Sequence, residues 1–211
     1  MVDSTAFVGE LCSSGAALGI DKTPIHHRPN AHRHPYTAVY TMLFSPLMHR
    51  SVLFAEIGIA GGGSALLWES YFKHPDAKIC MFDCDAKSLN NGRRMLGNRG
   101  RVGYMDVRVD GDVARALREL SGGELYDVIL DDSSHNFEDQ VRIVREALPL
   151  LKTGGMLVIE DVFRATPENE YLRALKDVFS DCAAAYFVDC EHVRRWSPGW
   201  DNDKLLILVN G

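Results

Sequence analysis

Two acidic stretches in this chain each follow a short apolar run of the kind that forms a buried strand. The stretch DDSSH occupies 131–135, and the pair ED occupies 160–161. If the two runs are neighbouring parallel strands, their carboxyl ends open on the same edge of a sheet. Asp132, Glu160 and Asp161 would then lie close together, and carboxylates so placed repel one another unless a cation neutralises them. Oxygen ligands favour a hard ion, so we predict a site for a divalent cation such as Mg²⁺.

His135 lies three residues after Asp132 and is the candidate general base. A neutral imidazole can accept a hydroxyl proton near neutral pH, and a bound metal lowers the pKa of that hydroxyl. The alternative is that His135 caps the next helix, or that it contacts a metal ligand without binding the metal itself. Asp131 is interpreted as a structural or cofactor-side neighbour of this site.

A glycine-rich stretch, EIGIAGGGS at 56–64, lies between an apolar run and an amphipathic one. Glycines let the backbone turn sharply there, and the amino-terminal end of the following helix offers free N–H groups to a ligand. Asp83 ends the next apolar run, roughly 25 residues after Gly58, where it could bond ribose hydroxyls. We therefore predict a bound nucleoside, contacted by these residues: Glu56, Gly58, Ala60, Gly61, Gly62, Ser64, Asp83 and Asp131. The stretch by itself leaves both S-adenosylmethionine and NAD open.

Apolar runs and amphipathic runs alternate after residue 50. Strands are expected at 51–58, 77–83, 102–109, 126–131, 156–160, 183–188 and 205–209. Helices are expected at 64–73, from 84 to about 96, and at 113–120, 137–151 and 167–179, with Ser64 as an N-cap and Gly154 and Gly155 ending the fourth. This order predicts an α/β fold with a mostly parallel, Rossmann-like sheet of seven strands, covered on both faces. A loop alone joins the last two strands, so they are expected to pair antiparallel.

Residues 1–50 differ from the remainder in that a Pro/His-rich stretch joins a short helix to an aromatic segment. We predict that 1–50 is an N-terminal helical cap that borders the active site, and that 51–211 is the cofactor-binding domain. The chain has 211 residues, a net charge of −6 and five cysteines without a C-x-x-C pair. This composition disfavours nucleic acid as a partner, a disulfide framework and a zinc site. No run approaches transmembrane length, so membrane insertion is not expected and a cytoplasmic location is.

The pattern Glu56-x-Gly58-x-Ala60-x-Gly62 resembles the first motif of class I S-adenosylmethionine-dependent methyltransferases, with alanine where a middle glycine is usual. Nearly the whole chain resembles the metal-dependent sugar O-methyltransferases of the macrolide-tailoring type. The motifs that carry this resemblance are Asp21-Lys22, His34-x-Tyr36-x-x-x-Tyr40, the loop 56–64, the stretches 131–135 and 160–161, and Asn202-Asp203-Lys204. The family usually has glycine at the position of Ser133.

The resemblance implies a class I methyltransferase fold, with Asp132, Glu160 and Asp161 as metal ligands and His135 as the base. It implies adenine contacts from Asp110 and Asp112, for which an exposed turn is the alternative. It also implies a small-molecule or glycan acceptor whose vicinal diol chelates the metal, with a deoxyhexose such as rhamnose as one candidate. Candidate acceptor contacts are His34, Tyr36, Trp196 and Trp200.

Three other functions stay open. A catechol or phenolic O-methyltransferase would use similar acids, although that group usually pairs Asp with Asn where this chain has Glu160-Asp161. A nicotinamide-dependent oxidoreductase would share the glycine loop, and an inactive nucleoside-binding module would share the fold. The residues do not decide the oligomeric state, so a homo-oligomer is also left open.

Overall fold

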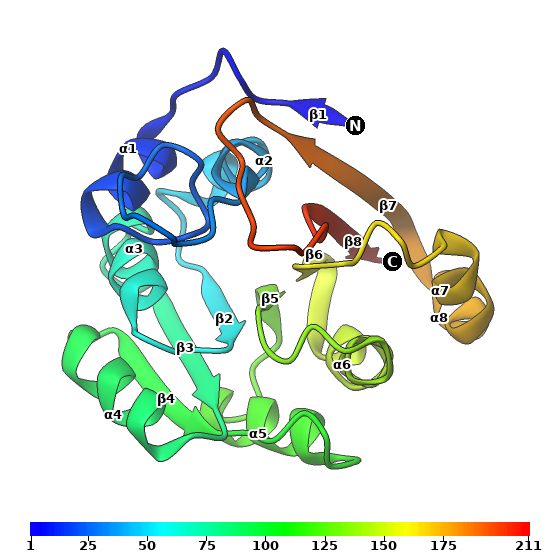
Figure 1. The fold of residues 1–211 in the computed structure, drawn as a ribbon. Helices are drawn as coiled ribbons and strands as arrows, with labels where there is room; N and C mark the ends of the chain where they lie inside the picture. Colours follow the sequence, from blue (N-terminus) through cyan, green and yellow to red (C-terminus); the bar gives the residue numbers. More distant parts are fainter.

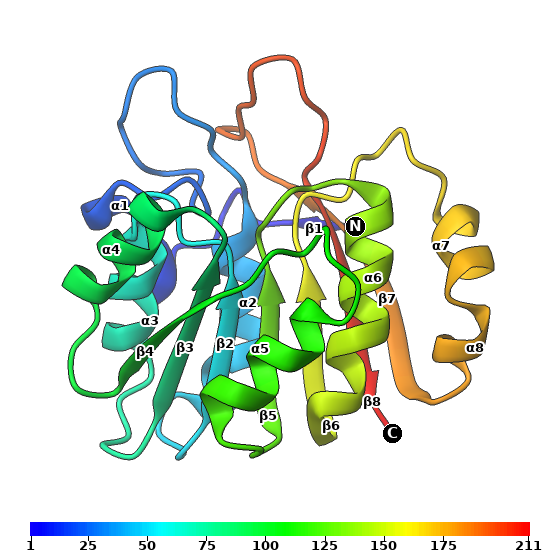
Figure 2. The ribbon, with the colours of Figure 1, turned by 90° about the horizontal axis from the view of Figure 1, so that it is seen from below.

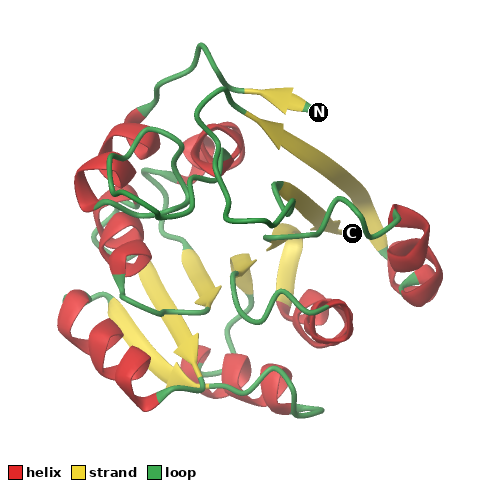
Figure 3. Cartoon of the chain, viewed as in Figure 1, coloured by secondary structure: helices red, strands yellow, loops and turns green.

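The strands form one eight-stranded sheet in the computed structural model, which describes residues 1–211. Their order across the sheet is β1-β7-β8-β6-β5-β2-β3-β4 (Figure 1 and Figure 3). The bounds are β1 Val2–Asp3, β2 Leu53–Ile57, β3 Lys78–Asp83, β4 Gly100–Tyr104, β5 Tyr126–Asp131, β6 Leu151–Ile159, β7 Cys182–Glu191 and β8 Lys204–Asn210. The predicted α/β sheet is confirmed, with one short strand more than expected. That strand is β1, which pairs with β7 and forms one edge of the sheet.

Strand directions place the chemistry-bearing residues at one edge. β2 is parallel to both β3 and β5, β5 is parallel to β6, and β3 is parallel to β4. β8 runs antiparallel to both β6 and β7, which confirms the predicted pairing of the last two strands. The carboxyl ends of β2, β3, β5 and β6 therefore meet at the same edge, beneath the loops that cross it (Figure 2).

Helices cover both faces of the sheet. They are α1 Glu10–Leu18, α2 Tyr36–Phe44, α3 Gly63–Tyr71, α4 Ala86–Met95, α5 Asp112–Ser121, α6 Phe137–Ala147, α7 Glu168–Ala174 and α8 Lys176–Phe179, with 3₁₀ turns at Ser45–Leu47 and Leu148–Leu150. Figure 2 shows α5 and α6 in front of the sheet and α1, α2 and α3 behind it. Side chains alternate between the two cores, so that Phe54 of β2 enters one while Leu53 and Ala55 enter the other. No helix has both the length and the apolar character needed to cross a membrane.

The first 50 residues contribute side chains to one of these two cores. Leu11 of α1 and Tyr40 and Phe44 of α2 are fully buried there with Phe54 and Trp68. The rings of Tyr40 and Phe44 stack with their centroids 5.3 Å apart. The segment predicted as a cap is thus packed against the sheet through its own aromatic side chains.

Several predicted boundaries were wrong. α3 begins at Gly63, with Gly62 rather than Ser64 at the N-cap position. α6 ends at Ala147 because Pro149, in the 3₁₀ turn that follows, cannot continue it. Gly154 and Gly155 therefore do not end that helix. They lie inside β6, where the register against β5 shifts and the chain bulges.

Two further elements are shorter than predicted. The third predicted strand, 102–109, is β4, which stops at Tyr104. The amide of Met105 then donates to the carbonyl of Asp83, and the chain turns across the edge of the sheet. The single helix expected at 167–179 is divided into α7 and α8 because Leu175 leaves the helical conformation, with φ −115° and ψ 20°.

Candidate active site

A cavity of about 730 Å³ opens at the carboxyl ends of the central strands. Its walls come mainly from 18–22, 57–61, 105–108 and 132–135. Clefts at this edge are where doubly wound sheets bind ligands, and the volume suits a small molecule.

The glycine loop closes one side of the cavity, and Gly58 is required there. Its φ is +107°, and a Cβ at this position would lie 1.9 Å from the carbonyl oxygen of Asp132. Ala60 has a positive φ of 44° although it is not glycine. The loop thus passes directly against the start of the stretch that carries Asp132 and His135.

Asp83 holds the shape of this loop from the end of β3. One carboxylate oxygen accepts hydrogen bonds from the amides of Ile59 at 2.9 Å and Ala60 at 3.3 Å. The other accepts from the amide of Asp85 at 2.8 Å. The oxygen that accepts from Asp85 has a further lone pair, and Asp83 lines the cavity, so its carboxylate can still accept from a ligand hydroxyl.

The predicted cofactor residues divide into two sets. Residues that line the cavity are Gly58, Ala60, Gly61, Ser64 and Asp83, whereas Glu56, Gly62, Asp110, Asp112 and Asp131 do not. Glu56 and Asp131 are fully buried beneath the site. Burial raises the pKa of Glu56 to about 7, and it raises that of Asp131 to about 7 as well.

Asp110 and Asp112 lie away from the cavity because β4 ends earlier than predicted. The Asp110 side chain is 91% exposed and pairs with Arg142 at 2.6 Å. The Asp112 carboxylate accepts from the amide of Asp106 and from Arg115. Asp106 and Arg108 line the cavity in their place.

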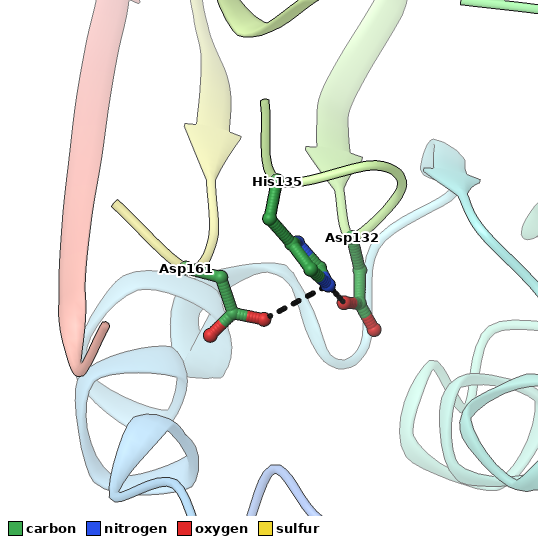
Figure 4. Close-up of side chains that lie close together, drawn as sticks. All are labelled: Asp132, His135 and Asp161. Carbon is green, nitrogen blue, oxygen red and sulfur yellow. Dashed lines mark ion pairs between the residues drawn. The ribbon is translucent and has the colours of Figure 1, made fainter. Parts of the chain in front are cut away.

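Asp132, His135 and Asp161 form a compact group that faces the open edge of the sheet. One ligand atom from each lies within 4.8 Å of the others. His135 Nε2 is 3.4 Å from Asp161 Oδ2 and 4.0 Å from Asp132 Oδ1 (Figure 4). His135 and Asp161 both have φ +56°, a backbone conformation that residues other than glycine seldom adopt. The fold imposes this strained backbone where the three side chains meet.

Glu160 belongs to a second acidic group, with Glu56 and Asp132. The ammonium of Lys22 lies between them, 2.5 Å from Asp132 Oδ2 and 2.7 Å from Glu160 Oε2. The hydroxyl of Tyr40 also donates to Glu160. The structure therefore places Asp132 with Asp161 in one group and with Glu160 in the other.

Polar side chains from the first 50 residues hold Asp161 in place. The Tyr36 hydroxyl donates to Asp161 Oδ1 at 2.7 Å, and His34 Nδ1 lies 3.7 Å from that oxygen. His34 Nδ1 also lies 2.8 Å from Asp203 Oδ1, and the other oxygen of Asp203 accepts from Arg195 at 2.8 Å. Burial raises the pKa of Tyr36, so its hydroxyl keeps the proton that it donates.

Lys22, Tyr40 and Asp203 are site residues to which the sequence assigns no role. All three occur in the motifs of the family resemblance, and that was the one available signal. Conversely, the predicted acceptor contacts His34 and Tyr36 are almost fully buried, and their rings stack on each other at 5.0 Å. They support Asp161 and present no free ring face to an acceptor.

The two predicted tryptophan contacts lie in a separate hollow of about 470 Å³ beside the loop 192–201. Trp196 pairs with Arg33 through the backbone, and the Arg33 guanidinium lies 5.6 Å from its ring centre. Trp200 is 52% exposed and packs edge-on against His32. The loops 22–35 and 192–203 are thereby joined above the sheet edge.

Comparisons with known proteins agree with this fold. A family model described as a methyltransferase domain matches residues 55–162, about half of the chain, from β2 to just past Asp161. The chain belongs to this family of methyltransferase domains.

Two curated relatives of this chain are sugar O-methyltransferases. Over 156 residues the chain is 29% identical to the 8-demethyl-8-alpha-L-rhamnosyl tetracenomycin-C 2'-O-methyltransferase of Streptomyces olivaceus, covering 70% of this chain and 37% of that protein. It is 31% identical over 142 residues to the corresponding 3'-O-methyltransferase, acting on the 2-methoxy-rhamnosyl compound, from the same organism, covering 63% and 33%. The alignments thus span about a third of these relatives' length.

Solved structures share the fold. The MycE methyltransferase from the mycinamycin biosynthetic pathway, in complex with Mg and SAH, superposes with a TM-score of 0.70 at 20% identity, covering 97% of this chain and 55% of that one. The O-methyltransferase TomG from Streptomyces achromogenes, in complex with SAM, gives a TM-score of 0.62 at 14% identity, covering 97% and 92%. The chain therefore has the Rossmann-like methyltransferase fold.

Proposed function

We propose that this protein transfers a methyl group from S-adenosylmethionine to a hydroxyl of a sugar, with the help of a divalent cation. The observation that carries the proposal is the position of Asp132, His135 and Asp161 beside the glycine-loop cavity. The family and the rhamnosyl substrates of the two Streptomyces olivaceus relatives support it.

The cofactor would occupy the cavity between the glycine loop and Asp106. Gly58 lines this cavity where the loop passes the Asp132 backbone, and Asp83 offers a carboxylate to ribose hydroxyls. S-adenosylmethionine supplies an electrophilic methyl group on a sulfonium. The chain itself holds the methyl donor beside the stretch 132–135. Donor and acceptor are then already oriented toward each other, so the transfer proceeds as an effectively unimolecular step.

The donor set fits a hard divalent cation. Asp132 and Asp161 provide carboxylate oxygens within 4.8 Å of each other and of His135. Glu160 is the third candidate ligand and is held by Lys22 and Tyr40 in this structure. A bound cation lowers the pKa of a coordinated hydroxyl.

His135 is the proposed general base. It lines the cavity, its side chain is 25% exposed, and Nε2 is the ring nitrogen that faces both carboxylates. In this proposal Nε2 accepts the proton of the acceptor hydroxyl, and the resulting alkoxide oxygen attacks the methyl carbon in line. Asp161, fixed by Tyr36, keeps the imidazole in position.

The acceptor is proposed to be a small glycosylated molecule that enters beneath the joined loops 22–35 and 192–203. Exposed Trp200 offers an apolar ring face of the kind that stacks on a pyranose. Labelled S-adenosylmethionine should be incubated with rhamnosides and, in parallel, with catechols. Labelling of the rhamnosides alone, lost with EDTA and restored by Mg²⁺, is the expected result. Labelling of the catechols alone would reject the sugar, and full activity after thorough chelation would reject the metal.

A further inference from the structure

Lys22 lies inside the protein, where its ammonium contacts acids from three adjacent strands. The residue is only 2% exposed. Its Nζ lies 2.5 Å from Asp132 Oδ2, 2.7 and 2.8 Å from the two oxygens of Glu160, and 3.2 Å from Glu56 Oε1. No other lysine or arginine forms an ion pair with these three carboxylates. Lys22 is therefore the one lysine or arginine that pairs with this acidic group.

The backbone of Lys22 is anchored as firmly as its side chain. Its carbonyl oxygen accepts hydrogen bonds from the amides of Tyr36 at 3.2 Å and Thr37 at 3.1 Å, at the first turn of α2. The same helix carries Tyr40, which donates to Glu160. The placement of Lys22 is thus part of how α2 joins the sheet.

A cation at this position stabilises the ionised forms of the three acids. Ligand atoms of Glu56, Asp132 and Glu160 lie within 4.8 Å of one another, and none of the three acids is more than about a quarter exposed. Carboxylates held this closely away from water repel one another, and removing one partner of a buried ion pair is strongly destabilising. In the neighbouring group of Asp132, His135 and Asp161, Lys22 pairs with Asp132 alone, and Asp161 forms no ion pair with a lysine or arginine.

We propose that Lys22 is a resident cation that occupies the space among Glu56, Asp132 and Glu160, and so directs a divalent ion to the other side of Asp132, where Asp161 lies and where His135 stays free to act as a base. Lys22 is then a positioning residue, since it acts through Asp132 and Glu160. The part of this inference that concerns the divalent ion rests on the proposed function. The part that concerns the pairing of Lys22 with the three acids is independent of the proposed function.

The test is Lys22→Met, which keeps the length of the side chain and removes its charge. In EDTA the melting temperature is expected to fall by about 10 °C, because three closely spaced acids, two of them buried, lose their only ammonium partner. Titration with Mg²⁺ should then raise the melting temperature of Lys22→Met far more than that of the wild type. Calorimetry should show Mg²⁺ bound about tenfold more tightly or better, since a competing positive charge is gone and Glu160 is released.

Two control variants separate charge from packing. Lys22→Arg keeps the charge, so its melting temperature in EDTA should lie closer to that of the wild type than to that of Lys22→Met. Lys204→Met removes another buried lysine, which is 5% exposed and 3.4 Å from Glu168, away from the acidic group. Its response to Mg²⁺ should match that of the wild type.

Three results would overturn the proposal. One is a Lys22→Met protein that melts like the wild type in EDTA, and another is weaker Mg²⁺ binding by that variant. The third is loss of S-adenosylhomocysteine affinity with unchanged melting, which would assign Lys22 to the cofactor.

If Lys22→Met does not fold, the double variant Lys22→Met with Glu160→Gln removes one charge of each sign and should fold. Failure of that double variant, while Glu160→Gln alone folds, also counts against the proposal. The melting experiments in EDTA do not depend on methyl transfer, so failure of the proposed function leaves them interpretable.

Discussion

His135 lines the cavity and Asp161 pairs with it, and both have a backbone conformation that costs energy. Only four residues other than glycine have positive φ, and three of them, Ala60, His135 and Asp161, belong to the predicted site. Strain of this kind persists where the surrounding structure enforces it, and it gathers at functional sites. The backbone conformation of Ala60, His135 and Asp161 thus supports a functional role for this site independently of their side chains.

His135→Ala is expected to lower kcat by about 10²- to 10⁴-fold, the usual contribution of a general base. The affinity for S-adenosylhomocysteine should stay close to that of the wild type, because His135 acts on the acceptor. Steady-state rates and calorimetry together measure this. The exposed His49→Ala serves as the control, and turnover that is equal in both variants would reject His135 as the base.

Asp161→Asn is expected to weaken Mg²⁺ binding on the order of 100-fold, since a neutral amide replaces a proposed carboxylate ligand. Calorimetric titration with Mg²⁺ gives the affinity directly. Asp110→Asn is the matched control because Asp110 is 91% exposed, and it should change neither Mg²⁺ nor cofactor binding. Unchanged Mg²⁺ affinity in Asp161→Asn would remove this residue from the ligand set.

At the scale of elements, the site depends on strand ends that are brought against one another. β2 and β5 are neighbours, and the loop after β2 passes the backbone of the stretch after β5 so closely that only glycine fits at 58. On the other side, His34 and Asp203 connect the segment before α2 to the start of β8. Both contacts fix where the acids lie relative to the cavity.

Gly58→Ala is expected to destabilise the protein by about 3 kcal/mol or more, because the added Cβ meets a carbonyl oxygen and positive φ strains alanine. Urea unfolding followed by circular dichroism gives the free energy of unfolding. Gly61→Ala is the control, since a Cβ there meets nothing within 4 Å. Equal stability of the two variants would show that the close approach at Gly58 is not enforced.

The contact between His34 and Asp203 should make stability fall as pH rises. Burial lowers the pKa of His34, but the hydrogen bond to Asp203 and the charge of Asp161 outweigh it, so the pKa is raised. A raised folded-state pKa contributes stability below the unfolded value of about 6.5, and this contribution disappears as pH rises through the folded value. In EDTA, the stability advantage of wild type over His34→Gln should therefore shrink from pH 6 to pH 9. The exposed His27→Gln should show no such trend, and an advantage that grows with pH would contradict the charged pair.

At the scale of the whole molecule, the N-terminal segment and the sheet form one structure around the site. Lys22, Tyr36 and Tyr40 come from the first 50 residues, yet each contacts an acid at the end of β5 or just after β6. Ligands that bind the cavity should therefore stabilise the fold as a unit.

S-adenosylhomocysteine at about 100 times its Kd should stabilise the protein by about 2.7 kcal/mol. For a chain of this size that corresponds to roughly 5–10 °C in melting temperature. NAD at the same concentration should leave the melting temperature unchanged. Stabilisation by NAD without stabilisation by S-adenosylhomocysteine would favour the oxidoreductase alternative.

Much of this protein follows from local sequence. Strand and helix periods and the order of the runs predict the parallel sheet, and β5 has the predicted bounds. The same local order predicts that Asp132, His135, Glu160 and Asp161 meet at one edge, because carboxyl ends of neighbouring parallel strands always do. The glycine loop and Asp83 are predictable for the same reason.

Tertiary structure alone decided the rest. Lys22 contacts Asp132 across 110 residues and Glu160 across 138, and His34 contacts Asp203 across 169. No period or spacing carries information over such separations, since they depend on how α2 and β8 pack on the sheet. The end of β4 at Tyr104 was likewise decided by the tertiary structure, and the turns that follow it place Asp110 and Asp112 outside the cavity. The sequence thus determined which acids gather, and the packing of distant segments determined which cation lies among them.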